Sequence, residues 1–128
     1  MITEDYVSFE TAKLLKEKGF DDEYTNAFYD KNGNLYFIDI LSDFSEHPDN
    51  DTDITASTLY VAMKWLREVH GLFIEVHIVG HSTAYMDNKY YFYKLYKNRR
   101  PLRFVENTFL TYEEACEAAI KYCLENLI

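Results

Sequence analysis

The sequence predicts an α+β fold, in which helices cover a mostly antiparallel sheet to form a two-layer α/β sandwich. Two observations carry this prediction. Three segments place apolar residues at helical spacing, and five short runs rich in aromatic and aliphatic residues lie around and between them. The predicted order of elements is α-β-β-α-β-β-β-α. With 128 residues, of which 48% are hydrophobic and 27% charged, the chain is expected to fold as a single domain spanning residues 1–128.

The N-terminal part is predicted to form a helix and then a hairpin. The helix begins at Ser8, a good N-cap residue, and Gly19 ends it. Strands are expected at residues 25–29 and 35–40 because the sequence Asp-Lys-Asn-Gly-Asn at 30–34 contains Asn-Gly, a strong hairpin signal. The second strand is apolar on both faces, which favours a central position in the sheet.

The second helix has the clearest apolar stripe of the chain. It is expected to begin at a cap on Thr55 or Ser57, to run to about Val69, and to close at Gly71. The last helix is expected to begin with a capping box, in which Thr111 is the N-cap and Glu114 the third helical residue.

Three strands are predicted between these two helices. They cover residues 72–79, 90–96 and 102–105, where aromatic and branched side chains are frequent. The connections are a loop over residues 80–88 and a tight turn at Asn-Arg-Arg-Pro, residues 98–101.

The cysteines and the N-terminus indicate a cytoplasmic protein. Cys116 and Cys123 are seven residues apart in the last predicted helix, about 10 Å along its axis, which exceeds the reach of a disulfide. Both are expected to be buried thiols. The acidic N-terminal segment does not resemble a signal peptide, and no run approaches the roughly 20 apolar residues of a membrane span, so no membrane association is expected.

Charge is unevenly distributed along the chain. Thirteen basic and 22 acidic residues give a net charge of −9, which on average repels nucleic acid and anionic lipid. Residues 39–53 hold six acids and no Lys or Arg, whereas residues 89–103 hold six bases and no acid. The second segment interleaves its bases with aromatic residues.

Candidate catalytic and metal-binding groups are few. Residues 49–53 match the first ligand positions of a calcium loop, but Ile54 and Tyr60 stand where Gly and Glu are required. Glu75 and His77 share one face of a predicted strand, as an acid–base pair or, more simply, as polar neighbours. Because nucleophile motifs, clustered metal ligands and phosphate-binding glycine loops are missing, we predict a non-enzymatic protein without cofactor or metal.

The tyrosine-rich segment predicts a binding role. Tyrosine is favoured at protein interfaces, so we expect association with a protein partner, or self-association, through Tyr91 and Tyr93. The alternative is nucleic-acid binding by a basic hairpin over residues 89–103, in which tyrosines stack on bases and cations hold phosphates. The cations of this alternative are Lys97, Arg99, Arg100 and Arg103. The net charge opposes it.

Two resemblances bear on these expectations. The α-β-β-β-α order of residues 55–128 is similar to that of the double-stranded-RNA-binding domain, whose last helix grips phosphates with a basic N-terminus. Here that helix begins with Tyr-Glu-Glu at residues 112–114, so that mode of binding is not implied.

The stretches YVSFETAKLLKEKGF (6–20), AMKWLREVH (62–70) and YEEA through the C-terminal LI (112–128) resemble a group of small uncharacterised proteins of gut Bacteroidetes and their phages or mobile elements. That resemblance implies a mobile-element origin and no particular activity. In that setting an acidic protein that presents carboxylates in place of DNA phosphates is a third interpretation.

Overall fold

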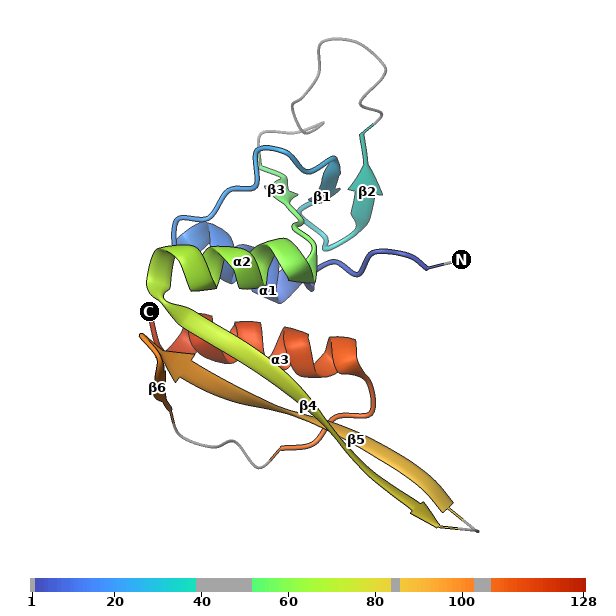
Figure 1. The fold of residues 1–128 in the computed structure, drawn as a ribbon. Helices are drawn as coiled ribbons and strands as arrows, with labels where there is room; N and C mark the ends of the chain where they lie inside the picture. The colour runs from blue at the N-terminus through green and yellow to red at the C-terminus, as the bar shows by residue number, and fades with distance from the viewer. Residues whose placement is uncertain (1, 39–51, 84–85, 103–106) are drawn as a thin grey trace. The chain divides into compact units, whose positions relative to one another are not determined.

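The computed structural model describes residues 2–38, 52–83, 86–102 and 107–128 (Figure 1). Their contacts divide the chain into two compact units, Met1–Thr58 and Leu59–Ile128, here called the N-terminal and C-terminal units. Helices and antiparallel sheets occur in both, which confirms the α+β class. Each unit contains a three-stranded sheet of its own among the described residues, so two small sheets replace the one that was expected. The single domain over residues 1–128 stays a prediction.

The first helix of the N-terminal unit forms where the sequence predicts it. Helix α1 spans Phe9–Glu17, and the side chain of its N-cap, Ser8, accepts a hydrogen bond from the Thr11 amide at 3.2 Å. Gly19 follows the helix with a φ of +94°, a conformation in which glycine is not strained. Thr11, Ala12 and Leu15 form the buried side of the helix.

The hairpin of this unit is also confirmed. Strands β1 (Ala27–Tyr29) and β2 (Leu35–Phe37) pair antiparallel, with Tyr29 opposite Leu35. The Asp30 carboxylate closes the turn by accepting hydrogen bonds from the amides of Asn32 at 2.8 Å and Asn34 at 2.9 Å. These bonds, that from Asn34 foremost, hold the pKa of Asp30 below its ordinary value.

The central position predicted for the second strand is wrong. The buried strand β1 lies in the middle, and the added strand β3 (Ile54–Thr55) pairs with its other side. Within the described residues β2 pairs with β1 alone, and the side chains of Leu35 and Phe37 are exposed. An apolar strand does not require a central position here, because Phe37 packs edge-on against the Tyr6 ring, with centroids 5.5 Å apart, while its side chain stays exposed. Residues 39 and 40 of the predicted strand lie outside the described residues.

The second helix begins later than the sequence indicates. Helix α2 spans Leu59–His70, whereas caps were expected at Thr55 or Ser57. Thr55 lies in β3, opposite Phe28 of β1, and the Ser57 carbonyl accepts a hydrogen bond from the Val7 amide at 3.0 Å. Because these contacts hold Thr55 and Ser57 in an extended conformation, Thr58 is the last residue before the helix.

A long hairpin dominates the C-terminal unit. Strands β4 (Leu72–Thr83) and β5 (Met86–Lys97) pair antiparallel from Leu72 opposite Lys97 to Thr83 opposite Met86. The loop predicted over residues 80–88 is therefore wrong for residues 80–83 and 86–88, which belong to the two strands. The polar sequence from Gly80 to Thr83 looks like a loop, but Ser and Thr are accepted in strands when the pairing of the preceding residues continues.

The hairpin continues into a short third strand. Asn98 and Arg99 have φ values of +50° and +70°, as in a type I′ turn, and β6 (Arg100–Pro101) then pairs back onto β5. The predicted turn at residues 98–101 is thus narrowed to two residues. Of the strand predicted at 102–105, Leu102 lies just beyond β6, and residues 103–105 are outside the described part of the chain.

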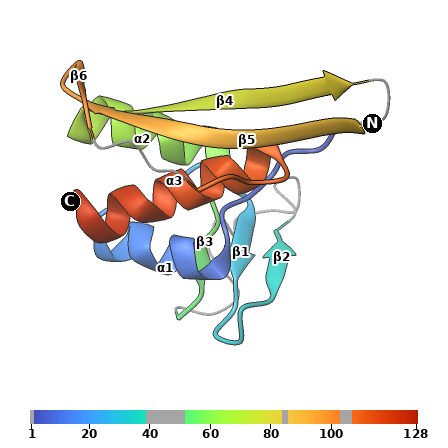
Figure 2. The same ribbon diagram turned by 90° about the horizontal axis from the view of Figure 1, so that it is seen from below.

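Helix α3 (Tyr112–Asn126) completes the C-terminal unit. Thr111 caps it as predicted, accepting a hydrogen bond from the Glu114 amide at 3.1 Å, while Glu114 accepts from the Leu110 amide at 3.3 Å. The helix packs along the β4–β5 hairpin (Figure 2), and α2 packs against both β4 and α3. The largest fully buried side chains of the unit are Leu66, Leu72, Leu95, Ile120 and Leu124. None of the helices within the described ranges has the length and apolar content needed to cross a membrane.

Both cysteines are buried free thiols of α3, as expected. Burial raises the pKa of Cys116 to about 11 and that of Cys123 to about 12. At pH 8 the thiolate is scarce in both, so alkylation of the folded protein by iodoacetamide is expected to be at least about 100-fold slower than for an ordinary thiol of pKa ~8.5. The same sample in denaturant is the control and should be labelled quickly at both sites. Fast labelling of the folded protein would contradict this assignment.

Candidate functional site

The two faces of the β4–β5 hairpin differ in what they contact. Directly opposed residues of an antiparallel pair project to the same side, so the register divides the side chains into two sets. One set faces the helices and is buried at Leu72, Tyr93 and Leu95, while its end residues Ile78 and Lys97 are exposed. We call the other side the open face. Its residues are Phe73, Glu75, His77, Val79, Tyr90, Phe92, Lys94 and Tyr96.

The two tyrosines expected at an exposed interface lie on the helix side. Tyr93 is only 3% exposed, its ring stacks on Phe109 with centroids 6.0 Å apart, and burial raises its pKa. Tyr91 is half-buried, with its ring edge-on to Tyr112 at 6.3 Å. Placing Tyr93 on an exposed surface was therefore wrong, because its position in the alternation turns it into the core.

The open face carries three of the four exposed large apolar side chains among the described residues of the hairpin, and the fourth, Ile78, belongs to the other set. Phe73 is 41% exposed, Val79 39% and Tyr90 37%. In the register, Phe73 is opposite Tyr96, and Val79 is opposite Tyr90. Apolar pairs thus occupy both ends of this face, with polar side chains between them.

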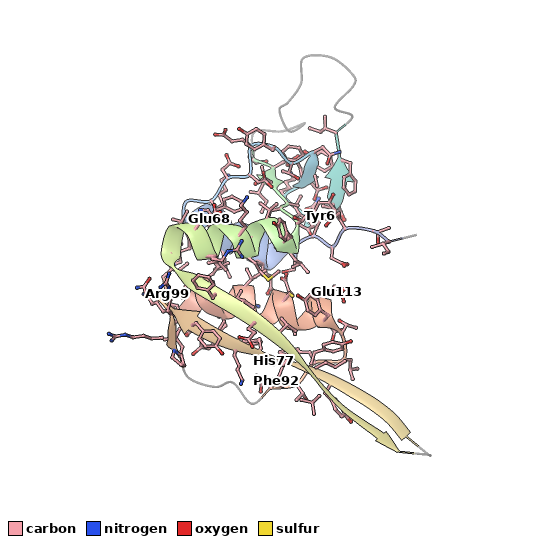
Figure 3. The ribbon with its side chains drawn as sticks, viewed as in Figure 1. Tyr6, Glu68, His77, Phe92, Arg99 and Glu113 are labelled. Carbon is pink, nitrogen blue, oxygen red and sulfur yellow. The ribbon has the colours of Figure 1, made fainter. Side chains whose placement is uncertain are left out.

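Glu75 organises the polar middle of the open face. Its carboxylate contacts Nε2 of His77 on the same strand and is hydrogen-bonded to the Tyr96 hydroxyl. The pKa of Tyr96 is raised, first because its hydroxyl loses contact with solvent, and further because it is hydrogen-bonded to Glu75 and lies near the negative charge of that carboxylate. The His77 ring stacks on Phe92 with centroids 5.0 Å apart and planes within 13° (Figure 3). Lys94 lies directly opposite Glu75.

This arrangement is that of a polar cluster within an exposed sheet face. A carboxylate beside an imidazole is able to exchange a proton, and the structure brings Glu75 and His77 into contact as the sequence suggested. The carboxylate, however, already has His77 and Tyr96 as partners, which is the pattern of a cross-strand network that stabilises a sheet. Among the described residues, no three His, Cys, Asp or Glu side chains come close enough together to hold a metal ion.

The described cations predicted to bind nucleic acid gather at the β5–β6 turn, at the end of the β4–β5 hairpin where β4 begins and β5 ends. Lys97, Arg99 and Arg100 are all exposed, and Arg99 lies in the type I′ turn between β5 and β6 (Figure 3). Arg103 lies outside the described residues. The first turn of α3 carries Glu113 and Glu114. The three described cations of this candidate site thus lie in one turn and the strand ends beside it.

The acidic segment of the sequence contributes one described carboxylate, Asp53, since residues 39–51 lie outside the described part of the chain. Asp53 is buried and accepts a hydrogen bond from the Tyr36 hydroxyl, so this carboxylate is engaged within the N-terminal unit. Ile54, which stands where a calcium loop needs glycine, begins strand β3.

The sequence analysis identified Glu75 and His77 of the open face, but it did not identify the other residues of this face as part of a candidate site. The signal that identifies this face is Lys94, because a charged side chain in an otherwise aromatic strand marks the solvent side. Counting in steps of two from Lys94 gives Tyr90, Phe92 and Tyr96, whereas Tyr91 and Tyr93 fall on the buried side.

Comparison with known proteins gives no relative: neither a family model, nor a curated protein, nor a solved structure matches this chain.

Proposed function

We propose that this chain is a cytoplasmic, non-enzymatic binding protein that associates with a protein partner through the open face of the β4–β5 hairpin. The observation that carries the proposal is the exposure of Phe73, Val79 and Tyr90 on one face of a rigid two-stranded element. Covering such side chains releases water from apolar surface, and tyrosine adds a polar tip for hydrogen bonding.

The polar middle of the face supplies specificity in this proposal. Glu75, His77 and Lys94 lie between the apolar ends, so a partner must match both charge and shape. The strand pairing fixes the positions of these side chains before binding, which lowers the entropy lost on association.

The test is capture of a partner from a nuclease-treated bacterial lysate by the tagged full chain. The variant Phe73→Ala/Tyr90→Ala removes one exposed ring from each strand of the open face and is expected to lose most of the stoichiometric partner. The matched control is Tyr60→Ala/Val69→Ala, which removes two exposed apolar side chains from α2. Equal recovery by both variants, or recovery of no protein by the wild-type chain, would overturn the proposal.

Nucleic-acid binding is the second candidate, favoured by the exposure of Lys97, Arg99 and Arg100 at one turn. The variant Lys97→Gln/Arg99→Gly/Arg100→Gln removes these charges while placing glycine at a position with φ of +70°. If this candidate is correct, the wild-type chain retains single-stranded RNA or DNA in a salt-dependent manner, and the variant loses about three salt-sensitive contacts. Without retention by the wild-type chain at low salt, this candidate fails. The mobile-element origin stays a prediction.

A further inference from the structure

The outer edge of β4 has no strand beside it within the described residues. In the sheet order β4-β5-β6, strand β5 is covered on its far side by β6 and by a bridge from Tyr91 to Phe109, whereas β4 is terminal. The edge is 12 residues long and contains no Lys, Arg or Pro, the residues with which proteins commonly block such edges. An edge of this length and composition is suited to pairing with another strand.

The hydrogen bonds of β5 show which β4 groups point outward. The Tyr91 amide and carbonyl both bond to Phe109, at 2.8 and 2.7 Å, and the Leu95 carbonyl accepts from the Leu102 amide at 2.8 Å. These groups therefore point away from β4. Since the direction repeats every two residues, the opposed residues Ile78, Val76 and Ile74 direct their own amides and carbonyls to the outer edge of β4.

The sequence of this edge is self-complementary when read antiparallel. With a two-fold axis at Val76, Glu75 of one copy lies opposite His77 of the other, and the same contact occurs twice. Phe73 then lies opposite Val79, and Ile74 opposite Ile78. Ile74, Val76 and Ile78 become the hydrogen-bonded pairs, in agreement with the outward direction of their backbone groups.

The neighbouring registers lose this match. An axis at residue 75 places the two Glu75 carboxylates opposite each other, and an axis at residue 77 does the same with the two His77 rings. An axis at residue 78 sets Glu75 opposite residue 81 but leaves His77 opposite Val79. The register centred on Val76 is favoured because it alone among these pairs both Glu75 and His77 with a polar residue. This register also covers Ile78, which is 57% exposed in the single chain.

We propose that two copies of this chain pair antiparallel through residues 73–79 of β4, about a two-fold axis at Val76. Each Glu75 carboxylate, which contacts His77 of its own strand in the single chain, then also lies opposite the His77 of the second copy. The two sheets become one continuous sheet with the open faces side by side. This inference goes beyond the proposed function, because it concerns the edge of β4 and a second copy rather than the open face and a different protein.

The test measures the mass of the purified full chain in solution by sedimentation. It compares this mass with that of variants whose charge is changed within the paired residues 73–79, here called the seam. We expect the wild-type chain to dimerise and His77→Glu to weaken the dimer by about tenfold or more, because it sets two carboxylate pairs opposite each other. The double variant Glu75→His/His77→Glu reverses the order of the two groups, places no lysine opposite Lys94, and is expected to restore the dimer. Tyr60→Glu adds the same single negative charge on α2 and should leave the dimer intact.

A second measurement keeps the inference testable if a seam variant fails to fold. Hydrogen exchange of the wild-type chain should show protection of the Ile74, Val76 and Ile78 amides that increases with protein concentration, while the Glu75 and His77 amides, bonded to β5, are protected throughout. A monomer at high concentration, or a double variant no better than His77→Glu, would overturn the inference. Partner capture and dimerisation are measured in separate experiments, so the proposed function and the proposed dimer can each be overturned without the other.

Discussion

Replacing Tyr93 with Ala is expected to lower the free energy of unfolding of the C-terminal unit by about 3–5 kcal/mol, the range for truncation of a large buried aromatic side chain. Tyr93 is 3% exposed, and its ring stacks on Phe109 at 6.0 Å. Removing the ring leaves a cavity between the sheet and the helix side, and the lost contacts are not replaced by water. Denaturant unfolding followed by circular dichroism measures the loss.

Tyr90→Ala is the matched control for this substitution. Tyr90 lies on the same strand but on the open face, where it is 37% exposed, so its removal is expected to cost less than about 1 kcal/mol. A Tyr93→Ala protein as stable as the wild-type chain would mean that Tyr93 is not a core residue. A Tyr90→Ala protein as unstable as Tyr93→Ala would mean that the register of the hairpin is wrong.

These two residues also show what sequence reasoning can and cannot determine about the site. The frequency of aromatic residues identified residues 90–96 as a strand, and that strand is present within β5. It left open which parity faces solvent, because both parities are rich in aromatic residues. Choosing the wrong parity moves every side chain of a strand to the opposite face. The predicted site residues Tyr91 and Tyr93 have the parity that faces the helices.

The fold was predictable where a local interaction decides it. Ser8 and Thr111 cap their helices through their own side chains, and the Asp30–Asn34 turn closes through the Asp30 carboxylate. Features that depend on distant pairing were not predictable. Thr55 looks like a helix cap but is held in β3 by its pairing with Phe28, which is 27 residues away in the sequence. The strand extensions at residues 80–83 and 86–88 are a different case, because their pairing is close in sequence but their polar composition gives no strand signal.

The second large effect is expected for Gly71→Ala, at about 2–3 kcal/mol of lost stability. Gly71 joins α2 to β4 with a φ of +66°, which costs a residue with a Cβ atom roughly 1–2 kcal/mol. An added Cβ would also overlap Oδ1 of the Asn98 side chain, and the backbone amide of Asn98 donates a hydrogen bond to the Gly71 carbonyl at 3.0 Å. The substitution therefore disturbs both the end of the helix and the type I′ turn beside it.

Two further variants separate the backbone strain at Gly71 from the contact with Asn98. Gly19→Ala, at a φ of +94° with no atom within 4 Å of the added Cβ, measures strain alone and is expected to cost about 1 kcal/mol. In Gly71→Ala/Asn98→Gly the obstructing side chain is absent and the positive φ at residue 98 remains accessible, so the cost attributable to the contact should be recovered. If the double variant recovers nothing, the whole cost lies in the backbone at residue 71, and the close packing of Asn98 against Gly71 contributes nothing to joining helix and hairpin.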